Sequence, residues 1–76
     1  MTQITEAERE AVHALWRVVY NDKGHFTQEM RLQAIRSLGA YLHVKEATSH
    51  LNSVIYDERR YDEKLKMAAI QVLGKA

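Results

Sequence analysis

The stretch MRLQAIRSLG at residues 30–39 decides the fold, because it occurs again as LKMAAIQVLG at residues 65–74. Four residue types keep their places in both copies, first as Ala34, Ile35, Leu38 and Gly39, and 35 residues later as Ala69, Ile70, Leu73 and Gly74. Apolar residues three and four positions apart lie on one face of a helix. Each copy therefore predicts an amphipathic helix, and the repetition predicts two similar helices in one chain.

The match continues when the offset of 35 is carried toward the N-terminus. Trp16 falls on Leu51, and the candidate N-cap residues Thr27 and Asp62 coincide. Two helices per unit, with a period between about 20 and 50 residues, are typical of α-solenoid repeats. The 76 residues are thus predicted to form a single domain with two tandem units. The predicted units span about residues 6–40 and 41–75.

Helix signals cover most of the chain. There is no proline and there are only three glycines, so few residues interrupt a helix. Thr5 and Glu8 form a capping-box pattern, which predicts a first helix over about residues 6–21. A second helix is predicted over about 28–41, a third ending at about 56, and a fourth from the cap at residue 62 to about 73. We expect an all-α fold of four antiparallel helices in two αα-hairpin units, either a short α-solenoid or a closed four-helix bundle.

The apolar stripes of these helices predict the core. Its predicted members are Val12, Leu15, Trp16, Val19, Ala34, Ile35, Leu38, Leu51, Val54, Ile55, Ala69, Val72 and Leu73. Arg31 falls inside the stripe of the second helix, where a charged side chain needs a partner or must extend toward water.

The two copies resemble the V-R-x-x-A-A-x-x-L-G helix of HEAT-like repeats. Glu46 and Ala47, followed by Leu51, Val54 and Asp57, resemble the partner helix of that family and its terminal aspartate. The resemblance covers nearly the whole chain. It implies a scaffold that binds other macromolecules and seldom does chemistry. It also implies ion pairs between neighbouring units, which would join Arg31 to Asp57 or Asp22.

Composition and motifs argue against chemistry. With no cysteine, neither a disulfide nor a thiolate metal site is available. No nucleophile elbow, phosphate-binding glycine loop or HExxH pattern is present. Glu46 and His50 lie one helical turn apart, but two ligands are too few for a structural zinc site. We therefore expect no catalytic residue, no metal site, no cofactor and no small-molecule substrate.

The charge balance disfavours nucleic acid as a partner. Eleven basic and ten acidic residues give a net charge of +1. The alternative of a nucleic-acid-binding module rests on the basic residues of the second and fourth helices and the turn between the third and fourth: Arg31, Arg36, Arg59, Arg60, Lys64, Lys66 and Lys75. No stretch approaches the ~20 apolar residues of a membrane span. No apolar signal region follows Met1, which predicts a cytoplasmic protein.

The fourth helix has too many apolar residues for the end of a repeat array. A terminal helix needs a polar outer face, yet Gln71 is the only polar residue between Lys66 and Gly74. Because the core needs only part of this helix, Met67 and Ile70 are expected to point elsewhere. The predicted interface comprises Lys66, Met67, Ile70 and Gln71. The predicted function is a non-enzymatic protein–protein interaction or adaptor module, either a homodimer or bound to another protein, with a small regulator that docks on an enzyme as an alternative.

Overall fold

A computed structural model of the chain describes residues 4–75, and within them it confirms the all-α class. No strand occurs in this range. The helices are α1 (Glu6–Tyr20), α2 (Gln28–Leu38), α3 (Lys45–Tyr56) and α4 (Glu63–Gly74), with a short 3₁₀ helix η1 (Gly39–Tyr41) after α2. Each of these helices is too short or too polar to cross a membrane.

Side-chain caps begin three of the four α-helices. The Thr5 hydroxyl accepts from the Glu8 backbone N–H at 3.1 Å, and the Glu8 carboxylate accepts from the Thr5 N–H at 3.1 Å, which confirms the predicted capping box. Thr27 caps α2 and Asp62 caps α4, each accepting the N–H three residues ahead. The first residues of α2 and α4 are 35 positions apart, and both helices begin with the same type of cap.

The connection between α1 and α2 depends on a residue that the sequence did not single out. Asn21 ends α1 in the left-handed conformation, at φ 53°. Its side chain donates to the Phe26 carbonyl at 3.1 Å and accepts from the Phe26 N–H at 3.0 Å. Gly24 in the same connection has a φ of 70°, a conformation that favours glycine. Asn21 therefore closes the turn that leads into α2.

The second α-helix ends earlier than predicted. Its regular part stops at Leu38, and the Gly39 N–H donates to the carbonyl of Arg36, three residues back, which is a 3₁₀ bond. Glycine weakens a helix interior by about 1 kcal/mol relative to alanine. The Val44 N–H then donates to the Tyr41 carbonyl at 2.8 Å and turns the chain into α3.

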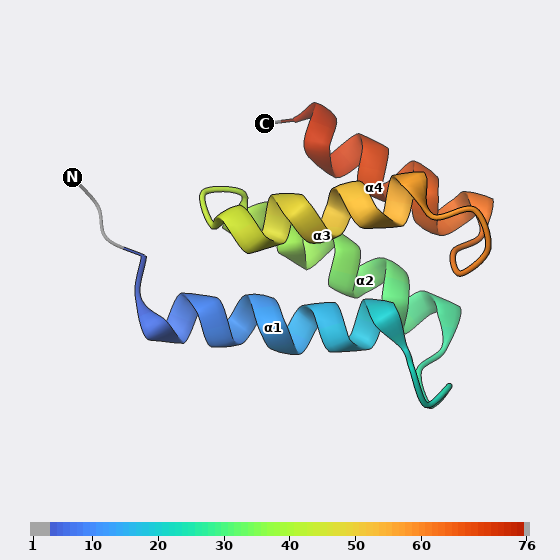
Figure 1. Ribbon diagram of the computed structural model, residues 1–76, viewed down its shortest axis with the longest axis horizontal. Coiled ribbons are helices and arrows are strands. Elements are labelled where there is room, and N and C mark those ends of the chain that lie inside the picture. The colour runs from blue at the N-terminus through green and yellow to red at the C-terminus, as the bar shows by residue number, and fades with distance from the viewer. Residues whose placement is uncertain (1–3, 76) are drawn as a thin grey trace.

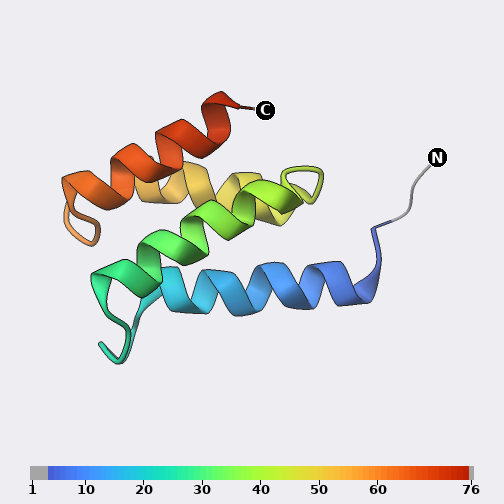
Figure 2. The ribbon, with the colours of Figure 1, turned by 180° about the vertical axis from the view of Figure 1, so that it is seen from behind.

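Each helix packs mainly against two others, in the cyclic order α1, α2, α4, α3. In Figure 1 the chain turns back at each of the three connections between α-helices. Viewed from behind in Figure 2, α2 lies in front of α3. In both views α1 and α4 lie at opposite edges of the molecule, so one side of α4 has no helix of this chain beyond it.

The core lies among all four helices. Of the residues predicted for it, Val12, Val19, Ala34, Ile35, Leu38, Leu51, Val54, Ala69 and Val72 are buried, while Leu15, Trp16, Ile55 and Leu73 are partly buried and pack against them. The buried set also includes residues outside the predicted list: Val44, Ala47, Tyr61, Leu65 and Ala68. Tyr61 lies in the connection before α4, where no helical periodicity could mark it as a core residue.

Candidate functional site

The exposed side of α4 carries a regular row of residues. Glu63, Met67, Ile70 and Gly74 follow the spacing i, i+4, i+7, i+11, and all four are exposed. We call this row the α4 stripe. The opposite side of the helix is buried and consists of Leu65, Ala68, Ala69 and Val72. Of the other two residues predicted for the interface, Gln71 is exposed and Lys66 is partly buried, both flanking the stripe.

The equivalent row on α2 consists of Gln28, Leu32, Ile35 and Gly39. Ile35 is buried and Gly39 lies against Val72 of α4, whereas Gln28 is exposed. Ile35 is 0% exposed, whereas Ile70, which stands 35 residues later, is 54% exposed. The same contrast appears at the glycines. A Cβ placed on Gly39 would lie 3.2 Å from Val72 Cγ1, while a Cβ on Gly74 would meet no atom within 4 Å. The α4 stripe thus has the composition of a covered helix face without its covering helix.

The exposed side of α2 differs in chemistry from the α4 stripe. The positions on α2 that correspond to Leu65, Ala68 and Val72 are Met30, Gln33 and Ser37. Gln33 is exposed and its Nε2 lies 3.5 Å from the Ser37 hydroxyl. Met30 is the one large apolar residue of the three, with 52% of its surface exposed. This side of α2 thus carries polar groups that water can solvate.

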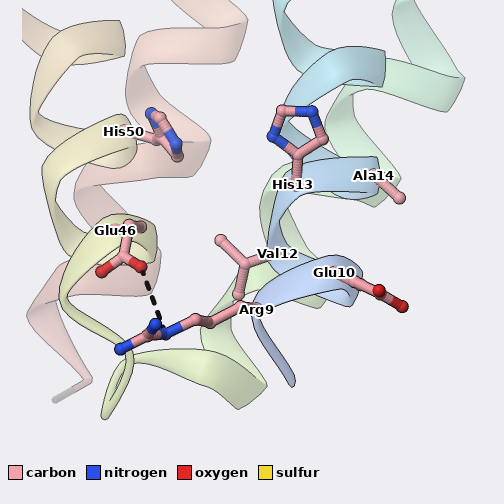
Figure 3. Close-up of a pocket in the computed structure, with 7 residues that line it drawn as sticks. All are labelled: Arg9, Glu10, Val12, His13, Ala14, Glu46 and His50. Atoms are coloured by element: carbon pink, nitrogen blue, oxygen red, sulfur yellow. Dashed lines mark ion pairs between the residues drawn. The ribbon is translucent and has the colours of Figure 1, made fainter. Parts of the chain in front are cut away.

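A groove of about 360 Å³ lies between α1 and α3 (Figure 3). Val12 points into it, His13 and His50 stand on its two sides, and Glu10 and Ala14 point away from it. An ion pair between Arg9 and Glu46, with Nε and Oε2 3.8 Å apart, bridges the two helices at one end. Both side chains are more than half exposed, so this pair contributes little to stability.

An aromatic cluster joins α1, α3 and the connection before α4. The Trp16 ring stacks on the His50 imidazole, with centroids 4.3 Å apart and planes inclined by 6°. Trp16 also contacts Tyr20 and Tyr61, with centroids 5.8 Å and 6.3 Å away. The Arg60 guanidinium lies over the Tyr20 ring, 4.0 Å from its centroid. Trp16 therefore contacts the three other rings of the cluster: Tyr20 on α1, His50 on α3 and Tyr61 before α4.

Burial raises the pKa of Tyr61 to about 12, so its phenol stays protonated at neutral pH. Burial also lowers the pKa of His50 below its usual value. Glu46 and His13 have smaller and opposite effects on the pKa of His50, because Glu46 favours its protonated form and His13 disfavours it. His50 is thus a half-buried, neutral ring at pH 7 and functions as part of the packing.

We expect His50 to make the folded chain less stable as the pH falls. Its lowered pKa in the folded state means that the unfolded chain takes up the proton at a higher pH. The free energy of unfolding should therefore decrease as the pH falls through about 6.5, the usual pKa of histidine. Thermal unfolding between pH 7.5 and 5 measures this, and His50→Gln should lose less stability over the range than the native chain.

His25→Gln is the control for this measurement, because His25 lies in the exposed connection between α1 and α2. This variant should keep the pH dependence of the native chain. If His50→Gln and the native chain lost equal stability between pH 7.5 and 5, burial of His50 would have no role in the pH dependence.

A second histidine joins the connection before α3 to the start of α1. His43 Nε2 pairs with Glu8 Oε2, although the two residues are 35 positions apart. This hydrogen bond, together with the one from the Thr5 backbone N–H, lowers the pKa of the Glu8 carboxyl. His43 and Glu46 thus have separate partners on α1, and His50 stacks on Trp16. Within residues 4–75, no group of three His, Cys, Asp or Glu side chains is placed to hold a metal ion.

Arg31 has different partners from those that the family resemblance implies. Its Nε donates to the Val19 carbonyl at 3.0 Å, and its guanidinium lies 5.6 Å from the centre of the Tyr61 ring. The ion pairs of residues 4–75 are Arg9–Glu46 and Glu8–His43, so the pairing of Arg31 with Asp57 or Asp22 is not found there. The carbonyl belongs to the last turn of α1, whose partial negative charge attracts a cation.

Asp57 is occupied by its own turn. Its Oδ1 accepts the backbone N–H groups of Arg60 at 2.7 Å and Arg59 at 2.9 Å, and these two bonds lower the pKa of the carboxyl. Asp22 is exposed in the connection after α1. Asp57 therefore holds its own turn, as aspartate side chains often do, and within residues 4–75 Arg31 is bonded to a backbone carbonyl and not to a carboxylate.

The basic residues considered for nucleic acid have mixed environments. Arg31 points inward to Val19, and Arg60 covers Tyr20. Lys66 is partly buried, whereas Arg36, Arg59, Lys64 and Lys75 are exposed. Arg31 and Arg60 therefore have roles within the fold that do not need a phosphate.

Comparisons of the chain with models of known protein families, with curated protein sequences and with solved structures found no match. Function must therefore be argued from the geometry of the chain itself. The strongest feature of the chain is the contrast between Ile35, which is buried on α2, and Ile70, which is exposed at the equivalent place in the α4 stripe.

Proposed function

We propose that this chain is a non-enzymatic protein–protein interaction module that pairs with a second copy of itself through the α4 stripe. The observation that carries the proposal is the exposure of Ile70, 54%, against 0% for Ile35 at the equivalent place. Covering apolar surface contributes about 25 cal/mol per Å². A partner that covers Met67 and Ile70 would recover the same kind of contact that α4 makes with α2.

We also infer that the four helices are two antiparallel αα-hairpin units of a HEAT-like repeat. The equal caps and the 35-residue offset between the starts of α2 and α4 support this interpretation. Side-chain contacts from α1 to α3 and to the connection before it support the interpretation as well, because they join residues about one period apart: Glu8 with His43, Arg9 with Glu46, and Trp16 with His50. Repeat arrays bury each unit against the next, so an uncovered last unit favours association.

A second copy is a better occupant for the α4 stripe than a head-to-tail chain of copies. In a head-to-tail array the stripe of one copy would meet the open side of α2 in the next, where Gln33 and Ser37 are polar. A two-fold pair instead places one stripe on the other, so that apolar surface covers apolar surface on both chains. The polar end of the array also argues that growth stops at two copies.

We expect the native chain to be a dimer at micromolar concentration, and Ile70→Glu to be a monomer. A carboxylate buried in the pair without a partner is strongly unfavourable, which should weaken association by about 100-fold or more. Light scattering after size exclusion measures the mass, and circular dichroism checks that helicity is retained. Met67→Glu should give the same result. A native chain that remains monomeric at about 500 μM would overturn the proposal, since a dimer with a useful affinity (Kd of μM) would be formed there.

Met30→Glu is the matched control for the charge substitution. Met30 has nearly the same exposure as Ile70, 52% against 54%, but lies at the polar end of the array. A glutamate at this place stands three residues after the N-cap Thr27 and would complete a capping box. This variant should stay folded and dimeric. If Met30→Glu were a monomer and Ile70→Glu remained a dimer, the interface would lie on α2 instead of the α4 stripe. The proposal would then be wrong.

A further inference from the structure

We propose that the two copies pair along α4 in opposite directions, about a two-fold axis that passes between Met67 and Ile70. This inference rests on the proposed function, and adds to it the direction and register of the two helices. The order of the α4 stripe carries the argument. When the stripe is set against its own reverse, Met67 faces Ile70 of the second copy, and Glu63 faces Gly74. Each residue of the α4 stripe then faces a residue of a different type in the second copy.

The apolar centre of this pairing is symmetric. Met67 and Ile70 are three residues apart, about 4.5 Å along a helix axis. In the reversed arrangement each exposed methionine, 55% exposed, covers the isoleucine of the other copy. The flexible methionine side chain can adapt its shape to the branched one. Both large exposed apolar residues of α4 are thus covered at once in each chain.

The charges at the two ends of the stripe favour the reversed direction over the parallel one. In a parallel pair Glu63 would face Glu63 of the other copy, and the like charges would repel. In the reversed pair Glu63 faces Gly74, beside the exposed Lys75. Gly74 has no side chain, and the space around its missing Cβ is open for 4 Å. The glutamate therefore has room to lie there and an ammonium group nearby.

Cysteine cross-linking distinguishes the two directions, and the chain suits it because it contains no cysteine. The single variants Glu63→Cys and Gly74→Cys are prepared separately, then mixed, equilibrated and oxidised with glutathione disulfide. Mass spectrometry under non-reducing conditions identifies the linked pairs. A disulfide needs Cα atoms about 4.4–6.8 Å apart. In the reversed pair residue 63 of one copy lies across from residue 74 of the other, so the mixed sample should give the disulfide between the two different variants.

Each variant oxidised alone is the control. In the reversed pair two copies of residue 63 lie about 16 Å apart along the helix axes, given a rise of ~1.5 Å per residue over 11 positions, and so do two copies of residue 74. Neither variant alone should then give more than a few per cent of linked dimer. Linkage of Glu63→Cys to itself, or a dimer that gives no linkage in the mixture, would overturn the reversed register while leaving a dimer in place. A chain that is monomeric by light scattering would overturn the proposed function and this inference together.

Discussion

Ile35→Ala should remove about 3 kcal/mol from the free energy of unfolding, because a buried isoleucine cut to alanine leaves a cavity as well as losing apolar contact. Ile35 is 0% exposed and belongs to the buried core, one helical turn before Gly39, which lies against Val72 of α4. A domain of this size has a net stability near the low end of the usual 5–15 kcal/mol. The substitution should therefore leave a chain that unfolds a little above room temperature or is partly unfolded already.

Ile70→Ala provides the matched comparison, since it makes the same chemical change 35 residues later, at an exposed isoleucine of α4. With more than half of the Ile70 side chain exposed, its truncation should cost less than about 1 kcal/mol in the single chain. Urea unfolding followed by circular dichroism measures both variants. The protein is kept below the dissociation constant of the dimer, and a second series is run well above it, because association adds to apparent stability. If the two substitutions lowered the free energy of unfolding equally at low concentration, the assignment of Ile35 as covered and Ile70 as uncovered would be wrong.

Features that depend on neighbouring residues could be predicted from the sequence. The capping box of Thr5 and Glu8 needs only a three-residue spacing, and the structure contains both of its hydrogen bonds. Thr27 and Asp62 cap their helices for the same local reason. Gly24 is the obvious turn residue after α1, whereas Asn21 makes the hydrogen bonds that close this turn. Asparagine adopts the left-handed conformation more readily than most residues, so this second signal was present in the sequence.

Features that depend on which helices meet could not be predicted in the same way. The pairs Glu8–His43 and Trp16–His50 join residues 35 and 34 positions apart, and helical periodicity alone does not identify such partners. The partner of Arg31 could not be predicted either. Its place in an apolar stripe indicated that it needs a partner, but its contact with a backbone carbonyl at the end of α1 left no trace in the side-chain pattern.

The candidate interface could be predicted only in part from the sequence. An excess of apolar residues on the last helix indicated a surface beyond the needs of the core, and Met67 and Ile70 are exposed as the pattern suggested. The structure adds a comparison that the sequence lacks. It shows the same two residue types in two surroundings: Ile35 is buried and Gly39 lies against α4, whereas Ile70 and Gly74 are exposed. Ile35 and Gly39 therefore indicate how Ile70 and Gly74 would be packed if a partner covered them.

Trp16→Ala should destabilise the chain by about 2–3 kcal/mol, somewhat less than a fully buried tryptophan would. The Trp16 side chain is partly buried and contacts His50 on α3, Tyr20 on α1 and Tyr61 before α4. Its removal takes apolar contact from all three elements at once. Chemical denaturation followed by circular dichroism at 222 nm measures the change, since the variant has no tryptophan for fluorescence.

Tyr56→Ala separates the loss of packing from the loss of an aromatic ring. Tyr56 is 78% exposed at the end of α3, so its truncation should change the free energy of unfolding by less than about 0.5 kcal/mol. Trp16→Ala has a further consequence for His50, because it uncovers the imidazole and relieves the burial that lowers its pKa. The loss of stability between pH 7.5 and 5 should then be smaller in Trp16→Ala than in the native chain. A variant that is destabilised but keeps the full pH dependence would show that Trp16 is not what buries His50.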